Sequence, residues 1–301
     1  RGQWICLESR RVAFDALTAR LSEAEPAALL PLLAVVAELD AVSECAAAWL
    51  ALRDLPQPED PALGARVQEV RLDLAVAWVK QIADDPSARA AIEALLQQSR
   101  ELDYAPLQAE LLARLAWIGL HAYDYELAAR QFAEAYAVAG RTGHEAVASS
   151  AAQGLILAQA QLGRFDEARA WAEAAAPLHR LPRQRIELSL VRGTLATLDG
   201  ELDEAAGHLD EASALWEAAR ASGAVMGRRS LEVTMHTGYA DVLVARDDYR
   251  GARRHYERAL QVQRELYGDA HATLPDLMIS LAEVERLDGD LAGARVRLEE
   301  A

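Results

Sequence analysis

The sequence contains no asparagine, one lysine and two cysteines, and only 6% of its 301 residues are aromatic. Lysine and asparagine both have A-rich codons, so their scarcity indicates a GC-rich, bacterial genome. Cys6 and Cys45 fall in different expected helical segments, and we interpret them as lone, buried thiols in a reducing compartment. A cytoplasmic location is therefore predicted.

Long apolar runs and positive charge are also missing. The longest apolar runs, such as ALLPLLAVVA at residues 28–37, are far shorter than the roughly 20 residues of a membrane-spanning helix, and no signal peptide is visible. The formal net charge is −16, and both halves of the chain are acidic. These features predict neither a nucleic-acid partner nor a membrane partner.

Patterns that carry chemistry are absent as well. The seven histidines are scattered, with no H-E-x-x-H pair and no spacing with cysteine that suits zinc. Ser149 and Ser150 lack the glycines of a nucleophile elbow, and the acidic stretch LDGD at 287–290 is too short for a calcium loop. The sequence thus predicts no catalytic residue, no metal site, no cofactor and no enzyme activity.

A repeated pattern is present instead. The stretch GRFDEARAWAEAA at 163–175 has counterparts elsewhere, such as GELDEAAGHLDEA and DDYRGARRHYERA, and a weaker copy lies near Ala88. Each copy has a turn, an aromatic residue or Leu, a small residue three positions later and Ala seven after that; four positions after the small residue the copies have a bulky residue, except for Ala172 in the copy at 163–175. These offsets place the residues on one helical face, so each unit reads as helix A, turn, helix B. The small residues that set the register are Ala128, Ala168, Ala205, Ala252 and Ala294.

This pattern resembles tetratricopeptide repeats over about residues 67–301, although its periods exceed the roughly 34 residues of that family. The resemblance implies an all-α fold, a right-handed superhelical α-solenoid with an N-terminal helical segment. We expect residues 1–60 to form a helical cap and a proline-rich elbow, and residues 61–301 to form an array of about six helix pairs. Asp60 and Asp85 are expected N-caps, Pro106 suits a first helical turn, and Gly143 suits a helix end.

In this family, side chains of the A helices line the concave groove and bind a protein or peptide. The absence of asparagine and the single lysine argue against the clamp that the family uses for C-terminal carboxylates. The acidic charge favours a basic or amphipathic partner. The resemblance places these residues in the groove: Glu110, Ala113, Trp117, Leu120, His121, Ser150, Gln153, Leu157, Gln161, Glu187, Leu190 and Thr194.

Trp117, with His121 one turn later, is the expected anchor for a partner; packing of Trp117 between repeats is the alternative. Phe165 is expected to wedge its helix B against neighbouring helices in the core. The arginine-rich stretch 250–258 is expected on a helix B, as a solvated face neutralised by nearby acids.

Two further resemblances concern context. The stretch W-x-C-L-x-x-R-R at 4–11, with YAPLQAELL at 104–112, resembles the region that follows the catalytic domain in bacterial, myxobacterial-type Hanks serine/threonine kinases. The stretch YGDAHATLP at 267–275 partly resembles the loop of kinesin-light-chain-like repeats. We expect a noncatalytic interaction scaffold from a larger bacterial signalling protein. The alternative is a ligand-sensing helical regulatory domain that changes curvature on binding a peptide or small molecule.

Overall fold

The computed structural model describes residues 2–23, 58–82, 85–222, 229–267 and 274–301. Within these ranges the chain forms helices and turns, without a β-strand, which confirms the predicted all-α class. Cys45, His271 and the expected helices at 26–39 and 43–52 lie outside the described residues.

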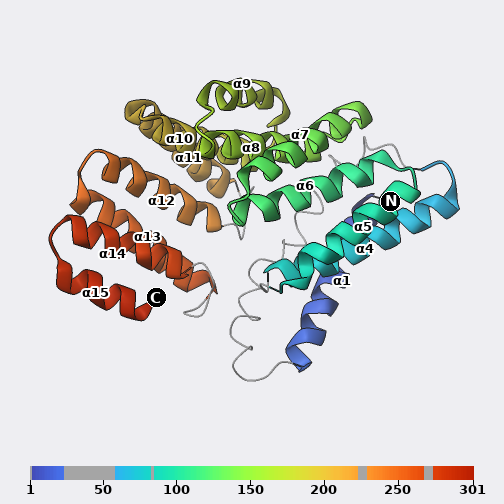
Figure 1. The fold of residues 1–301 in the computed structure, drawn as a ribbon, viewed down its shortest axis with the longest axis horizontal. Helices are drawn as coiled ribbons and strands as arrows, with labels where there is room; N and C mark the ends of the chain where they lie inside the picture. The colour runs from blue at the N-terminus through green and yellow to red at the C-terminus, as the bar shows by residue number, and fades with distance from the viewer. Residues whose placement is uncertain (1, 24–57, 83–84, 223–228, 268–273) are drawn as a thin grey trace. The chain divides into compact units, whose positions relative to one another are not determined.

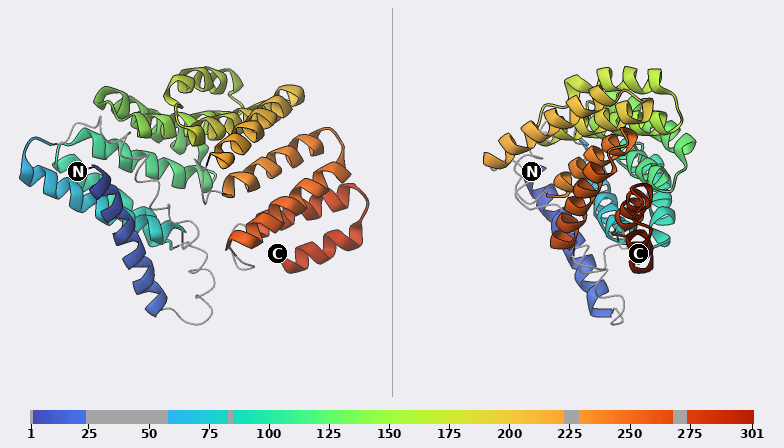
Figure 2. Two further views of the ribbon diagram at one scale, coloured as in Figure 1. Left: turned by 180° about the vertical axis from the view of Figure 1, so that it is seen from behind. Right: turned by 90° about the vertical axis from the view of Figure 1, so that its left-hand side faces the viewer.

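Within each described range, consecutive helices are joined by short connections (Figure 1, Figure 2). They are α1 (Gly2–Glu23), α4 (Pro61–Ile82), α5 (Ser87–Glu101), α6 (Ala105–His121), α7 (Tyr125–Thr142), α8 (Glu145–Gln161), α9 (Phe165–Ala175), α10 (Pro182–Asp199), α11 (Leu202–Ala221), α12 (Ser230–Ala245), α13 (Tyr249–Tyr267), α14 (Leu274–Leu287) and α15 (Leu291–Glu300), with the 3₁₀ helix η1 (Ala176–Leu178) after α9.

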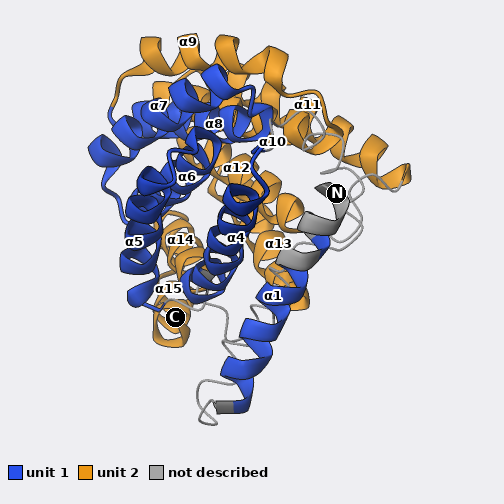
Figure 3. Ribbon diagram, turned by 90° about the vertical axis from the view of Figure 1, so that its right-hand side faces the viewer, with its two compact units in different colours: residues 1–162 blue, residues 163–301 orange. Residues whose placement is uncertain are grey.

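The chain divides into two compact units, Arg1–Leu162 and Gly163–Ala301 (Figure 3). In the first unit α1 packs on α4, and each helix from α4 to α8 packs on the next. In the second unit α9 packs on α10, and consecutive helices from α10 to α15 do the same. The boundary falls in the turn between α8 and α9, which the sequence groups as one pair. The predicted division into residues 1–60 and 61–301 stays a prediction.

Helix starts and ends follow local sequence. The carboxylate of Asp60 accepts a hydrogen bond from the Ala62 backbone N–H at the start of α4. Asp85 accepts one from the Ser87 N–H at the start of α5. Gly143 ends α7 in the left-handed region, with φ of 72°. These contacts satisfy backbone groups that a helix leaves unpaired at its ends, as the sequence predicted.

The five small residues that set the repeat register are buried. Ala128 explains why small residues are needed there, because a methyl group added to Gly119 of α6 would lie 3.6 Å from the Ala128 Cβ. The backbones of α6 and α7 therefore approach closely, and a side chain larger than alanine at either position would push them apart.

The bulky residue four positions later packs into the neighbouring helix. Phe132 of α7 is fully buried, and its ring fills the space beside Gly154 of α8 so completely that an added methyl group there would overlap it. Leu209 of α11 repeats this arrangement between Gly193 of α10 and Gly238 of α12. Large-into-small packing thus joins successive helix pairs within each unit, as the repeat pattern predicted.

Phe165 was predicted to lie in the core, but it is less buried than expected. Its side chain is only partly buried, and it is the first residue of α9. The buried core of α9 comes from Ala168, Ala172 and Ala175.

Five turns between helices have a left-handed residue at the same place, five positions before the register alanine. Three of these are glycines, and the others are Asp247 with φ of 59° and Tyr123 with φ of 61°. A tyrosine in this region costs about 1 kcal/mol relative to glycine. The Tyr123 side chain is 74% exposed, so little burial offsets that strain.

Candidate functional site

A polar cluster joins the A helices of the first unit. The guanidinium of Arg71 in α4 donates two hydrogen bonds to the Glu110 carboxylate of α6, at 2.7 and 3.1 Å. Nε2 of His144, the residue before α8, lies 3.3 Å from the same carboxylate. Burial raises the pKa of Glu110, but Arg71 and His144 outweigh burial and bring the pKa to about 2. Glu110 is therefore an ionised group that holds three helices together.

Trp117 of α6 contacts the two helices that follow it, α7 and α8. Its indole Nε1–H donates to the hydroxyl of Ser150 in α8 at 3.0 Å. Its ring meets Phe132 edge to face, with 5.2 Å between centroids, and stacks on His121 at 6.0 Å. The side chain remains half-buried. Trp117 therefore packs between helices and still presents part of its ring at the surface.

The other groove positions of the first unit differ in accessibility. His121 and Gln161 are exposed, and Leu120 and Leu157 are partly buried. Ala113 and Gln153 are buried, with 6% and 8% of their surface accessible, so they contribute to packing. The resulting accessible face, called here the helix-A face, consists of Trp117, Leu120, His121, Ser150, Leu157 and Gln161.

Three predicted groove residues lie in the second unit, on α10. Glu187 accepts a hydrogen bond from Arg183 of the same helix at 2.6 Å. Leu190 is buried, and the Thr194 hydroxyl donates to its backbone carbonyl at 3.2 Å. These side chains make local contacts within the second unit, and we treat them separately from the helix-A face.

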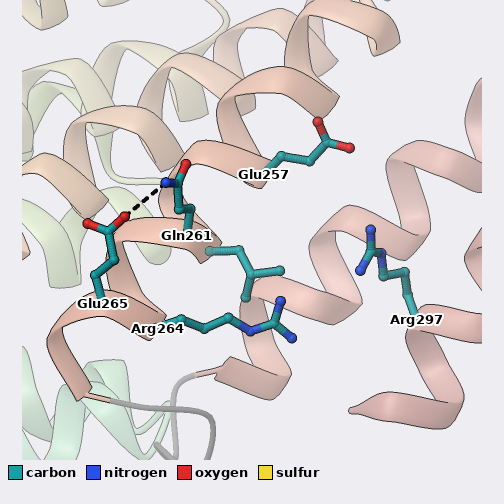
Figure 4. A pocket seen from close by; sticks show the side chains of 6 residues that line it. Glu257, Gln261, Arg264, Glu265 and Arg297 are labelled. Atoms are coloured by element: carbon teal, nitrogen blue, oxygen red, sulfur yellow. Dashed lines mark hydrogen bonds between the residues drawn. The ribbon is translucent and has the colours of Figure 1, made fainter.

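The second unit contains a pocket between α13 and α15 (Figure 4). Its volume is about 450 Å³, and its lining contains acidic and basic side chains and the apolar Leu260. The lining residues are Glu257, Leu260, Gln261, Arg264, Glu265 and Arg297. This pocket could not be predicted from the sequence, because Arg297 is 33 positions away from Arg264 and in a different repeat.

A contact between two histidines was also not predicted from the sequence. Nδ1 of His236 in α12 and Nδ1 of His255 in α13 are 3.1 Å apart, so one ring donates to the other. Burial lowers the pKa of both imidazoles; the neighbouring His255 lowers the pKa of His236 further, and Arg254 that of His255. Glu232 opposes the shift at His236. The pair is thus held in its uncharged form near neutral pH.

Arginines of the stretch 250–258 in α13 are paired with acids, as predicted, but most of these acids lie on neighbouring helices and not close by in the sequence. Arg253 reaches Glu257 and the buried Glu285 at 3.2 and 3.0 Å, and Arg258 reaches Glu232 at 2.8 Å. This stretch therefore serves pairing between neighbouring helices more than attraction of an anionic partner.

The described ranges contain no group of three or more His, Cys, Asp or Glu side chains that could hold a metal ion. Of the helices in those ranges, none is both long and apolar enough to cross a membrane.

A comparison with protein families agrees with a repeat architecture in the last part of the chain. Residues 231–301 match the family described as Tetratricopeptide repeat, and repeats of this family generally mediate protein–protein interaction. Among solved structures, the crystal structure of BtubC (BKLC) from P. vanneervenii is similar at 18% identity, with a TM-score of 0.45, over 80% of this chain and 89% of that one. No curated protein matches the chain.

Proposed function

We propose that the protein is a noncatalytic interaction scaffold that holds a protein or peptide segment on the helix-A face. The observation that carries this proposal is the hydrogen bond between Trp117 and Ser150. Both residues were placed in the groove from sequence, on two successive A helices, and their contact means that the two helices present these positions side by side. The tetratricopeptide-repeat match of residues 231–301 supports an interaction role in general.

The face suits a segment with both apolar and basic character. Leu120, Leu157 and part of the Trp117 ring offer apolar surface, and His121 and Gln161 offer polar contacts at its edge. The net charge of −16 attracts a basic segment over long distances. Such binding should weaken as salt is added, because exposed charges are then screened.

The proposed context is a larger cytoplasmic bacterial signalling protein, a serine/threonine kinase that uses this scaffold to hold its target. The stretches at 4–11 and 104–112 support this context by resemblance. The sequence of the complete gene tests it directly: a kinase domain encoded upstream would support the proposal, and another type of domain would contradict it.

The ligand-sensing alternative is supported by one specific observation, the pocket between α13 and α15. A small molecule bound there would contact α13 and α15, and could alter how these helices pack. The two functions make different predictions about which helices a ligand protects.

The test begins with a peptide selected for binding from a random library. The scaffold proposal predicts that the bound peptide slows amide hydrogen exchange in α6 and α8. Trp117→Ala should weaken binding by about 2 kcal/mol or more, the scale of an interface hot spot. Trp171→Ala is the matched control, because Trp171 is also half-buried but lies on helix α9.

If Trp117→Ala unfolds the protein, Leu120→Asp and His121→Ala replace it, because these side chains are more peripheral to the core. Lost affinity in a folded variant supports the helix-A face. Unchanged affinity in both folded variants, or protection confined to α13 and α15, would refute it.

A further inference from the structure

The turn between α6 and α7 holds a tyrosine where the fold favours glycine. Tyr123 has a φ of 61°, and the equivalent residues of three other turns are glycines with φ between 71° and 91°. A side chain in the left-handed region crowds the backbone, and Tyr123 is 74% exposed, so burial returns little of that free energy. Strained residues of this kind concentrate where a protein binds a ligand or partner, which makes Tyr123 a candidate contact residue.

Tyr123 forms an aromatic pair with Tyr125. Their rings meet edge to face, with 6.2 Å between centroids and 85° between planes. Tyr125 is the first residue of α7 and is partly buried, whereas the Tyr123 side chain is accessible. The face of an aromatic ring carries partial negative charge and attracts cations, arginine more often than lysine. The pair therefore offers a surface that favours a cation over an anion.

The charge around the pair has the same sign. Asp124 lies between the two tyrosines in the chain and is exposed. Its carboxylate accepts a hydrogen bond from the backbone N–H of Leu127 at 3.3 Å, a group without net charge. Burial lowers the pKa of His121, two residues before Tyr123, so this imidazole adds no positive charge near neutral pH. A positively charged side chain is thus the group that this turn accommodates best.

We propose that the turn between α6 and α7 binds an arginine side chain of the partner, with the guanidinium on the Tyr123 ring and Asp124 as its countercharge. This inference rests on the proposed function, because it names one residue of the segment that the helix-A face would hold. Leu120 and His121 of that face lie in the last turn of α6, so a segment that extends past them reaches Tyr123. Arginine suits the site better than lysine, since its planar group stacks on aromatic faces and is more weakly hydrated.

Peptides selected from a random library against the original protein supply the probe. Calorimetry compares the affinity of the tightest peptide for the original protein, for Tyr123→Gly and for Tyr123→Phe. Each arginine of the peptide is also replaced in turn by citrulline, which keeps the shape of the side chain and removes its charge. Circular dichroism gives the melting temperature of each variant.

Tyr123→Gly should weaken binding about fivefold or more, the scale of a cation–aromatic contact. Its melting temperature should equal or exceed that of the original protein, because glycine relieves the left-handed strain. Tyr123→Phe keeps the ring and should bind within about twofold of the original. One change from arginine to citrulline should weaken binding to the original protein about fivefold or more, but binding to Tyr123→Gly by about twofold or less, which assigns that arginine to Tyr123.

Asp247→Gly is the matched control, because Asp247 holds the equivalent left-handed position in the second unit, with φ of 59°. It should leave affinity within about twofold of the original. Affinity that falls in Trp117→Ala but not in Tyr123→Gly would overturn the arginine site alone, and the reverse result would refute the helix-A face alone. A tightest peptide without arginine, or a lower melting temperature of Tyr123→Gly, would also overturn the arginine site. Failure to select any peptide would overturn both proposals.

Discussion

Gly154→Ala should destabilise the first unit, although alanine normally stabilises a helix. The added methyl group would overlap the ring of Phe132, which is fully buried and meets Trp117 edge to face at 5.2 Å. The ring has no open side to move toward, so the helices must shift. Overpacking of this kind costs about 1–3 kcal/mol, and the better helix propensity of alanine returns about 1 kcal/mol. Because the overlap involves three atoms of the ring, the cost should be about 2–3 kcal/mol, so a net loss of about 1–2 kcal/mol is expected.

Hydrogen exchange of amides in α6, α7 and α8 measures this loss locally, which avoids assuming that both units unfold in one step. Gly207→Ala is the control, since a methyl group there has no atom within 4 Å and the site is an exposed position inside α11. That variant should gain up to about 1 kcal/mol.

A second substitution tests the stated cause. Phe132→Leu removes the part of the ring that the new methyl group would overlap, so the double variant should be more stable than the sum of the two single effects by about 1 kcal/mol or more. If Gly154→Ala matches or exceeds the stability of the original protein, or if the two changes simply add, the tight contact between α7 and α8 does not exist.

Three further outcomes are expected. Glu110→Gln should cost about 3–5 kcal/mol, because Arg71 is 9% exposed and would lose its countercharge. Folding lowers the pKa of Glu110 from 4.5 to about 2, so protonation of Glu110 destabilises the original protein as the pH falls through this range. The variant should lack this contribution, which a pH titration followed by circular dichroism measures. Phe165→Ala should cost about 1–2 kcal/mol, less than a fully buried phenylalanine, and a denaturation-derived loss above about 3 kcal/mol would contradict its partial burial. Folding lowers the pKa of His236 and His255 below 6.5, so the unfolded chain binds more protons in acid and stability should fall as the pH drops below that value. His255→Gln should therefore make the decrease in melting temperature between about pH 7.5 and about pH 5.5 less steep. An unchanged slope would show that the histidine pair does not cause this pH dependence.

Much of the packing could be predicted from sequence, because it depends on spacing along single helices. The register alanines, together with Phe132 and Leu209, recur at offsets that place them on one helical face, and all are buried. Phe165 shows the limit of this reasoning. Its offset is the same as in the other copies, but burial also depends on which helix covers it and how far along that helix it lies.

The candidate sites were less accessible to sequence reasoning, because they depend on contacts between side chains of different helices. The sequence placed Glu110 in a groove, but its pairing with Arg71, 39 positions away, makes it structural. Likewise, the pocket lined by residues of both α13 and α15 depends on how these two helices are placed. One signal could have been found: Tyr123 aligns with glycine in three other turns, so its strain was visible in the repeat alignment.

The shared carboxylate of Glu110 has a consequence for cooperativity. In stacked repeats, stability is commonly approximated as a sum of separate terms for each unit and each interface. Here one carboxylate takes part in two interfaces, through Arg71 of α4 and through His144 at the start of α8. Opening the first interface leaves a buried charge that weakens the second, so the two interface energies are not independent. Helices α4, α6 and α8 should therefore open as one block, with a sharper transition than a chain that frays one repeat at a time.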